Sequence, residues 1–318
     1  MAVLGIDLGG TKLAGAVFSE DGSMISEKMV LVAGRGGRDV GELITSHIKS
    51  FLTEQQEIAD EIVSIGVCVP GISYQKAGTV WAPNIPSWED YPLLSEIRST
   101  VGSIPVSIDS DRACYILGEL WQGAAQGCTA AIFLAVGTGI GAGILVDSKV
   151  LRGTHDSAGS TGWMALERPF QPKFTECGNF ETFASGEGIP EYFRELLSKT
   201  DGYDGFLKNK PPEEIVALDV FEAYDRDDPL AREVVERCIE LWGMAAANLV
   251  SLFDPEKIIF GGGVFGPAIQ FLPEIYAEAR KWAQPVAIKQ VRFEPSSLGN
   301  HAGVFGAGLL ALRNLKEN

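Results

Sequence analysis

Residues 2–18 read AVLGIDLGGTKLAGAVF, and residues 131–146 read AIFLAVGTGIGAGILV. Each stretch has a short apolar run, a turn rich in glycine with one threonine, and a second apolar run, which is the pattern of a β-hairpin. The turns fall at residues 8–12 and 137–141. Because the same plan opens both halves of the chain at a long interval, it predicts two similarly built α/β domains rather than a solenoid.

Hydrophobic periodicity predicts the remaining elements. The strands are expected at residues 62–69, 106–108 and 257–260, and helices at 44–52, 112–121, within 218–253 and at 302–315. These elements divide the chain into an N-terminal α/β domain of residues 1–118, joined by a C-terminal helix of about 303–318, and a larger α/β domain of 119–302.

Composition limits the possible partners. The 318 residues are 46% hydrophobic, enough for two cores, and 26 Lys and Arg against 42 Asp and Glu give a formal charge of −16. So acidic a chain repels nucleic acid and anionic membrane surfaces. An anionic ligand would therefore have to be held by local backbone amides.

Cysteine usage and the N-terminus indicate the compartment. The five cysteines form no CxxC pair, so neither a disulfide framework nor a compact thiolate site is expected. The N-terminus has no positively charged leader, which argues against a signal peptide. Residues 128–146 are uncharged, but their alternating glycines are typical of a turn and not of a spanning helix. These features predict a soluble, cytoplasmic protein.

Three glycine-rich turns, at residues 9–11, 137–139 and 261–263, could each be an ordinary turn. Taken together they suit a nucleotide held between two domains, because glycine lets backbone N–H groups approach an anion. The 137–142 segment also matches a loose dinucleotide-binding pattern, but β-like residues follow where that pattern requires a helix. A dehydrogenase is therefore the weaker interpretation.

The acidic segment Asp109-Ser110-Asp111 follows the strand predicted at 106–108. Ligands bind at the carboxyl ends of strands in open α/β sheets, and a carboxylate there can take a proton from a hydroxyl that attacks a phosphoryl group. The alternative is a helix N-cap, which Asp and Ser commonly provide. The segment alone leaves both roles open.

The combined motifs resemble the ROK family of sugar kinases, and they run in family order over almost the whole chain. They are the DxGGT run from Asp7, Val69-Pro70-Gly71, residues 82–88, Asp111 with Glu119, residues 137–141 and residues 261–263. The resemblance implies an actin/hexokinase-like (ribonuclease H-like) two-domain fold with a cleft between the domains. It also implies ATP-dependent phosphorylation of a sugar, with Mg²⁺, in a homodimer.

The resemblance also assigns residues. It makes Asp111 the catalytic base and places Ser110, Gly71 and Asn84 beside the sugar. It assigns ATP to the glycine turns, with phosphates at Gly9, Gly10, Thr11, Lys12, Gly137, Thr138 and Gly139, and adenosine at Gly262 and Gly263. It gives Asp7 the role of orienting Mg²⁺ through water.

The chain departs from the family at the next two motifs. Ser160 and Trp163 stand where the family has the Glu and His of its ExGH motif, and the cysteine-rich zinc run keeps only Cys177, with Asn179 at the last ligand position. One thiol cannot form a tetrahedral zinc site, so no zinc is predicted. His155 is expected to be an ordinary loop residue. Glu181 is retained as a candidate sugar anchor.

These departures are expected to change the sugar specificity more than the phosphoryl-transfer chemistry. Trp163 could stack on a sugar ring, or it could fill the volume left by the zinc loop. Selection for glucose is therefore not assumed. A non-catalytic sugar-binding sensor is the alternative to a kinase, whereas Asp7 lies too close to Met1 for the DNA-binding domain of the family's repressors.

Overall fold

The computed structural model describes residues 1–54 and 61–317. The chain forms two compact units. The first unit comprises Met1–Gly127, Val150–Ala158 and Ser297–Asn318, and the second comprises Cys128–Lys149 and Gly159–Ser296. Among the described helices, none combines the length and the apolar character that crossing a membrane requires.

The first unit is built on a five-stranded sheet. Its order is β3 (Met24–Leu31), β2 (Lys12–Ser19), β1 (Ala2–Leu8), β4 (Ile62–Val69) and β7 (Val106–Ser110). The β1–β2 pair is the predicted hairpin, and β1, β4 and β7 run parallel. Sequence analysis did not anticipate β3, an edge strand whose side chains alternate between half-buried and exposed. A short hairpin of β5 (Ile72–Tyr74) and β6 (Thr79–Trp81) follows β4.

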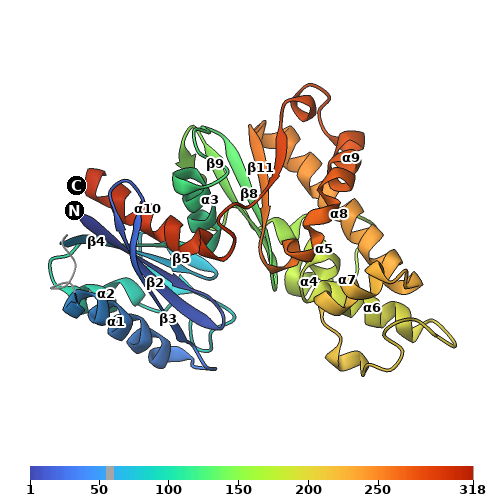
Figure 1. Ribbon diagram of the computed structural model, residues 1–318, viewed down its shortest axis with the longest axis horizontal. Helices are drawn as coiled ribbons and strands as arrows, with labels where there is room; N and C mark the ends of the chain where they lie inside the picture. Colours follow the sequence, from blue (N-terminus) through green and yellow to red (C-terminus); the bar gives the residue numbers. More distant parts are fainter. Residues whose placement is uncertain (55–60, 318) are drawn as a thin grey trace. The chain divides into compact units, whose positions relative to one another are not determined.

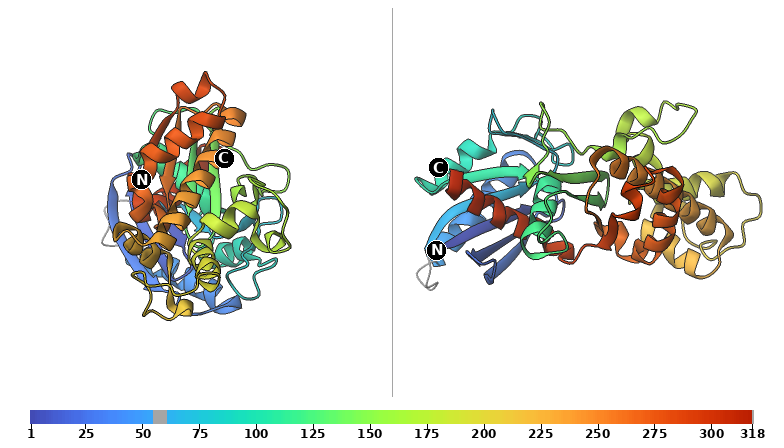
Figure 2. Two further views of the ribbon diagram at one scale, coloured as in Figure 1. Left: turned by 90° about the vertical axis from the view of Figure 1, so that its right-hand side faces the viewer. Right: turned by 90° about the horizontal axis from the view of Figure 1, so that it is seen from above.

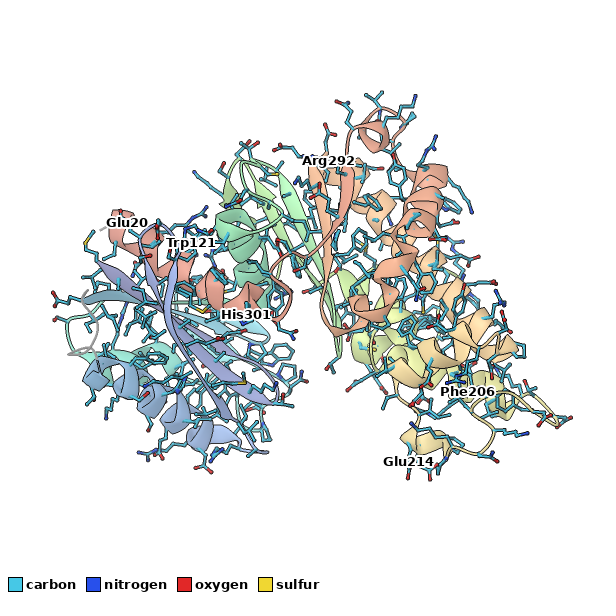
Figure 3. All side chains as sticks on the ribbon, viewed as in Figure 1. Glu20, Trp121, Phe206, Glu214, Arg292 and His301 are labelled. Atoms are coloured by element: carbon cyan, nitrogen blue, oxygen red, sulfur yellow. The ribbon has the colours of Figure 1, made fainter. Side chains whose placement is uncertain are left out.

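Helices cover both faces of this sheet. Helices α1 (Gly37–Glu54) and α2 (Leu93–Val101) lie on one face, and α3 (Asp111–Gln122) and α10 (Ala302–Glu317) lie on the other (Figure 1). Glycine permits the close approach of α10, because a side chain at Gly66 would lie 1.9 Å from the Ala307 carbonyl oxygen. At the end of α3, Trp121 packs edge-on against Phe18, with ring centroids 5.4 Å apart (Figure 3).

The second unit has its own five-stranded sheet. Its order is β10 (Lys149–Val150), β9 (Ile140–Val146), β8 (Ala131–Val136), β11 (Lys257–Gly261) and β12 (Arg292–Pro295). The β8–β9 pair confirms the second predicted hairpin. The turn is shorter than the predicted 137–141, because Ile140 and Gly141 already pair in the ladder. Strand β11 runs parallel to both β8 and β12.

A group of helices packs against this second sheet (Figure 2). They include α4 (Phe174–Cys177), α5 (Asn179–Ala184), α6 (Gly188–Ser198), α7 (Ala217–Asp225), α8 (Pro229–Phe253) and α9 (Leu272–Trp282). Helix α8 is largely apolar and passes through the core. Its buried Trp242 donates a hydrogen bond to the Ala184 carbonyl at 3.1 Å, which fixes the end of α5 to α8.

Candidate functional site

Two carboxylates lie in register at one edge of the first sheet. Asp7 of β1 and Asp109 of β7 both pair with Cys68 of β4, which lies between them. In-register residues of parallel strands project to the same face, so both carboxylates project toward the α3 and α10 side. The sheet thereby brings together acids that are about a hundred residues apart in sequence.

Asp111 begins α3 directly after this edge. The helix is capped by Ser110, whose Oγ accepts the Ala113 N–H at 3.4 Å, so the expected cap falls on Ser110 and not on Asp111. Asp111 Oδ1 accepts the adjacent Arg112 N–H at 2.7 Å. Burial raises the pKa of Asp111 to about 6, against the lowering effect of Arg112. Such a pKa suits a carboxylate that accepts a proton near neutral pH.

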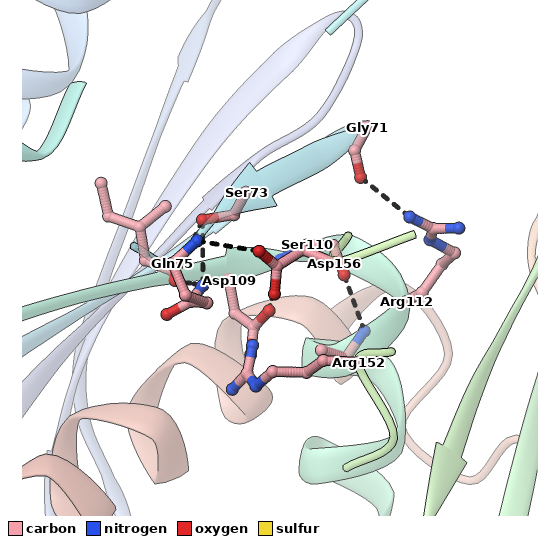
Figure 4. A network of polar contacts seen from close by, with 10 residues as sticks. Gly71, Ser73, Gln75, Asp109, Ser110, Arg112, Arg152 and Asp156 are labelled. Atoms are coloured by element: carbon pink, nitrogen blue, oxygen red, sulfur yellow. Dashed lines mark hydrogen bonds and ion pairs between the residues drawn. The ribbon is translucent and has the colours of Figure 1, made fainter. Parts of the chain in front are cut away.

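Asp109 forms an ion pair with Arg152, a residue that belongs to none of the motifs found in the sequence. Its side chain is almost fully buried, and Arg152 Nη1 lies 2.5 Å from Asp109 Oδ2 (Figure 4). The same segment, Val150–Ala158, also contributes Asp156, whose Oδ2 accepts the Gln75 N–H at 3.2 Å. Burial raises the pKa of Asp109, and the Arg152 charge opposes this rise. Sequence reasoning missed Arg152 because only the fold brings it to β7.

The Gly71 turn lies against the end of β6. Gly71 has a φ of 84°, and a side chain there would lie 2.1 Å from the Trp81 carbonyl oxygen, so glycine is required. Arg112 Nη2 donates to the Gly71 carbonyl at 3.2 Å, which links this turn to the start of α3 (Figure 4). Asn84 is exposed in the following loop. The hydrogen bond from Arg112, the residue that follows Asp111, therefore ties the Gly71 turn to the start of α3.

Asp7 is half-buried beside the first turn of α10. A side chain at Gly303 would lie 2.3 Å from Asp7 Oδ2, so glycine allows the helix to reach this carboxylate. Burial raises the pKa of Asp7, and a hydrogen bond with the Cys68 thiol opposes the rise. The start of a helix carries a partial positive charge, which favours a carboxylate at this position.

The first glycine turn leaves space around its backbone. Gly9 donates to the Lys12 carbonyl at 2.9 Å, and residues 9–12 are all exposed. A side chain at Gly10 would meet no atom within 4 Å, and its φ is not positive. Packing within the described chain therefore does not explain this glycine, whereas close approach of a ligand to the backbone would.

The two glycine turns of the second unit lie side by side. A side chain at Gly262, which has a φ of 91°, would lie 2.4 Å from the Val136 carbonyl oxygen, directly before the Gly137 turn. Gly137 and Gly263 have open space where a side chain would be. Thr138 is exposed between Gly137 and Gly139. These open turns can accommodate an anionic group near their backbones.

The remaining candidates of the second unit surround α5. Glu181 Oε2 accepts the Ile140 N–H at 2.5 Å, and burial raises the pKa of Glu181. Ser160 is exposed and precedes the short helix η2 (Thr161–Trp163). Trp163 is 55% exposed, so its side chain does not fill an interior volume of this unit.

The residues at the positions of the family's zinc motif form hydrogen bonds within this unit. Cys177 Sγ lies 3.4 Å from Thr182 Oγ1, and the buried Asn179 accepts the N–H groups of Leu166 and Glu167 through Oδ1 at 2.8 and 3.1 Å. His155 is exposed in the Val150–Ala158 segment. Within residues 1–54 and 61–317, no group of three or more His, Cys, Asp or Glu side chains could hold a metal ion.

Two units that each open with a strand–glycine turn–strand hairpin, with acids at the carboxyl edge of the first sheet, define the actin/hexokinase-like class of proteins. The sequence matches the ROK family over residues 3–314, and the chain belongs to that family.

The similar proteins include kinases and repressors. The chain is 31% identical to a glucokinase of Halalkalibacterium halodurans over 96% of this chain and 94% of that protein. It is 28% identical to a xylose repressor of Caldicellulosiruptor bescii over 99% of this chain and 79% of that protein. A ROK glucokinase of Streptomyces griseus, solved with glucose and AMPPNP, superimposes with a TM-score of 0.77 at 28% identity, covering 98% of this chain and all of that one.

Proposed function

We propose that this protein is an ATP-dependent carbohydrate kinase that transfers the γ-phosphate of ATP to a hydroxyl of a hexose or related sugar. The observation that carries the proposal is the position of Asp111, which starts α3 beside the acid pair of the first sheet, where burial raises its pKa to about 6. The similarity to glucokinases supports this chemistry.

Asp111 is the catalytic base in this proposal. Its carboxylate accepts the proton of the attacking sugar hydroxyl as the sugar oxygen bonds to the γ-phosphorus. The bond from that phosphorus to the bridging oxygen of the β-phosphate breaks, and ADP leaves with the electron pair. The backbone N–H of Arg112 donates a hydrogen bond to Asp111 Oδ1 and so helps to orient this carboxylate.

We assign the nucleotide to the glycine turns. Gly9, Gly10, Thr11 and Lys12 of the first unit, and Gly137, Thr138 and Gly139 of the second, would contact the phosphates, with Gly262 and Gly263 beside adenosine. The open space at Gly10, Gly137 and Gly263 fits a ligand that approaches the backbone. Asp7, a half-buried carboxylate, would hold Mg²⁺ through water, and Mg²⁺ when bound supplies neutralisation of phosphate charge.

We assign the sugar to the two groups of residues that the sequence suggested. In the first unit these are Gly71, Asn84 and Ser110, and in the second they are Ser160, Trp163 and Glu181. The exposed indole of Trp163 supports a stacking role. With Ser160 and Trp163 at positions where hydroxyl-binding Glu and His are expected, an aminosugar, deoxysugar or polyol is as good a candidate as glucose.

The Asp111→Asn variant tests the proposal. With each member of a broad sugar panel, ADP release is measured for the unaltered protein, and the best substrate is then used for the variant. We expect the variant to lose about 10²- to 10⁴-fold in kcat while its binding of AMPPNP–Mg²⁺ is unchanged. Unchanged turnover would contradict the role of Asp111.

A non-catalytic sugar sensor is the second candidate. The similarity to a xylose repressor and the replaced sugar motif at Ser160 and Trp163 favour it. Isothermal titration with AMPPNP–Mg²⁺ distinguishes the two, because a sensor of sugar alone would not bind the nucleotide. We also propose a homodimer, as the family resemblance implies, which sedimentation would test.

A further inference from the structure

Glu181 makes a contact that a sugar anchor alone does not require. Its Oε2 accepts the N–H of Ile140, the residue that follows the Gly137-Thr138-Gly139 turn. In an antiparallel hairpin such an N–H either pairs across the ladder or points away from it. Here the carboxylate of α5 satisfies it.

Two further contacts come from the same corner between α5 and α6. The Gly186 N–H donates to the Gly137 carbonyl at 2.7 Å, and the Glu187 N–H donates to the Thr138 carbonyl at 3.4 Å. The corner is fixed in turn, because Ser185 Oγ accepts the Gly188 N–H at 2.9 Å. The backbone of the turn is thus held from one side, with Thr138 exposed on the other.

The surrounding glycines make room for this carboxylate. A side chain at Gly139 would lie 2.7 Å from Glu181 Oε2, and one at Gly162 would lie 2.6 Å from the same atom. Neither glycine has a positive φ, so their small size and not their backbone conformation explains them. Both leave space for Glu181 against the turn.

We propose that Glu181 is a positioning residue for the phosphate-binding turn: through Oε2 it fixes the Gly137-Thr138-Gly139 backbone in the conformation that receives the nucleotide. This inference rests on the proposed function, because it takes the turn to bind ATP phosphates. The other carboxylate oxygen, Oε1, would make the sugar contact proposed above. The Glu181 side chain would then contact the sugar through one oxygen and support the nucleotide-binding turn through the other. Its removal should therefore weaken nucleotide binding even when no sugar is present.

The test measures AMPPNP–Mg²⁺ affinity by isothermal titration without sugar. Glu181→Ala removes the acceptor of the Ile140 N–H, and we expect at least about tenfold weaker binding, the size of effect that loss of one supporting hydrogen bond produces. Glu181→Gln keeps an acceptor oxygen of the same shape, so we expect binding within about threefold of the unaltered protein. Glu187→Gln, which removes an exposed carboxylate from the same corner but keeps the backbone N–H, is the charge-matched control.

The outcomes separate this inference from the proposed function. If the unaltered protein does not bind AMPPNP–Mg²⁺, the kinase proposal itself fails. If it binds and Glu181→Ala binds equally well, only the positioning role is overturned, and a change confined to the KM of the sugar would make Glu181 a sugar ligand alone. Should Glu181→Ala not fold, Gly162→Ala carries the same test, since its methyl group would displace the carboxylate from Ile140, and unaltered binding in that variant would overturn the inference.

Discussion

Arg152 Nη1 lies 2.5 Å from Asp109 Oδ2, although Arg152 follows the hairpin of the second sheet in sequence and Asp109 belongs to the first. The pair fixes the Val150–Ala158 segment to the end of β7, the strand that leads into Ser110 and Asp111. Asp109 also accepts the Ser110 N–H at 2.8 Å. The backbone directly before the proposed base is therefore held by a charged network.

Arg152→Ala should destabilise the protein. It leaves the buried Asp109 carboxylate without its counter-charge. A fully buried pair that loses one partner costs roughly 3–5 kcal/mol in free energy of unfolding, and because Arg152 is partly exposed we expect a loss of about 2–4 kcal/mol. Urea denaturation measures this loss. Because Asp109→Asn removes the charge that needs compensation, the double variant should lose less than the sum of the single variants. Arg38→Ala, which breaks an exposed pair with Glu42, is the control, and a loss there as large as in Arg152→Ala would contradict the argument.

The pH dependence of kcat/KM should reflect Asp111. Since the proposed base works only when deprotonated, activity should rise with pH through a midpoint near the pKa of about 6. Arg112 lowers this pKa, whereas the charges of Asp7 and Asp109 raise it. Arg112→Ala should therefore move the midpoint to higher pH, and Arg112→Lys should move it less. A midpoint that stays fixed in Arg112→Ala would contradict the assignment.

As the pH rises, the ionisation of Asp111 should lower the stability of the protein while it raises the activity. Burial raises its pKa above the usual value of 3.8, so the folded protein binds the proton more tightly than the unfolded chain does. This favours folding fully below about pH 4, and the advantage is lost as the pH rises through about 6. Asp111→Asn should thus raise the melting temperature at pH 7.5 more than at pH 5. A variant that is less stable than the unaltered protein at pH 7.5 would disprove the claim.

Asn179 should stabilise the region where the family has zinc. Asn179→Ala leaves the Leu166 and Glu167 N–H groups without their acceptor and should cost about 1–3 kcal/mol in free energy of unfolding. Asn179→Asp keeps an acceptor and should cost less. Because hydrogen bonds and not thiolates hold this segment, EDTA should leave the melting temperature unchanged. A chelator-induced drop would indicate a structural metal that these residues do not predict.

Trp163→Ala should weaken sugar binding and leave stability nearly unchanged. The indole is 55% exposed, so its loss removes little buried apolar surface. If it stacks on the sugar, the KM of the sugar should rise by about tenfold, which corresponds to a stacking contribution of about 1.4 kcal/mol. Trp282→Ala, which removes another exposed indole of the same unit, should not change KM. Equal effects of the two variants would exclude a specific role for Trp163.

Local patterns predicted most of the secondary structure. The apolar runs around the two glycine turns became β1–β2 and β8–β9, and the strand predicted at 62–69 became β4 with the same bounds. The predicted end of β7, at residue 108, was wrong by two residues, because Asp109 and Ser110 still pair with β4. Polar residues terminate a strand by propensity alone, but the ladder continues because β4 offers partners to both.

The sequence by itself determined the hairpins, the glycine turns, the position of Asp111 after a strand and the family, because all of these depend on the order and spacing of neighbouring residues. Only the tertiary structure decided that Arg152 neutralises Asp109, that Asn179 holds the segment around Leu166, and that Glu181 supports the turn before Ile140. None of these contacts follows from the order of neighbouring residues, and their geometry arises when strands and helices pack to bury their apolar faces.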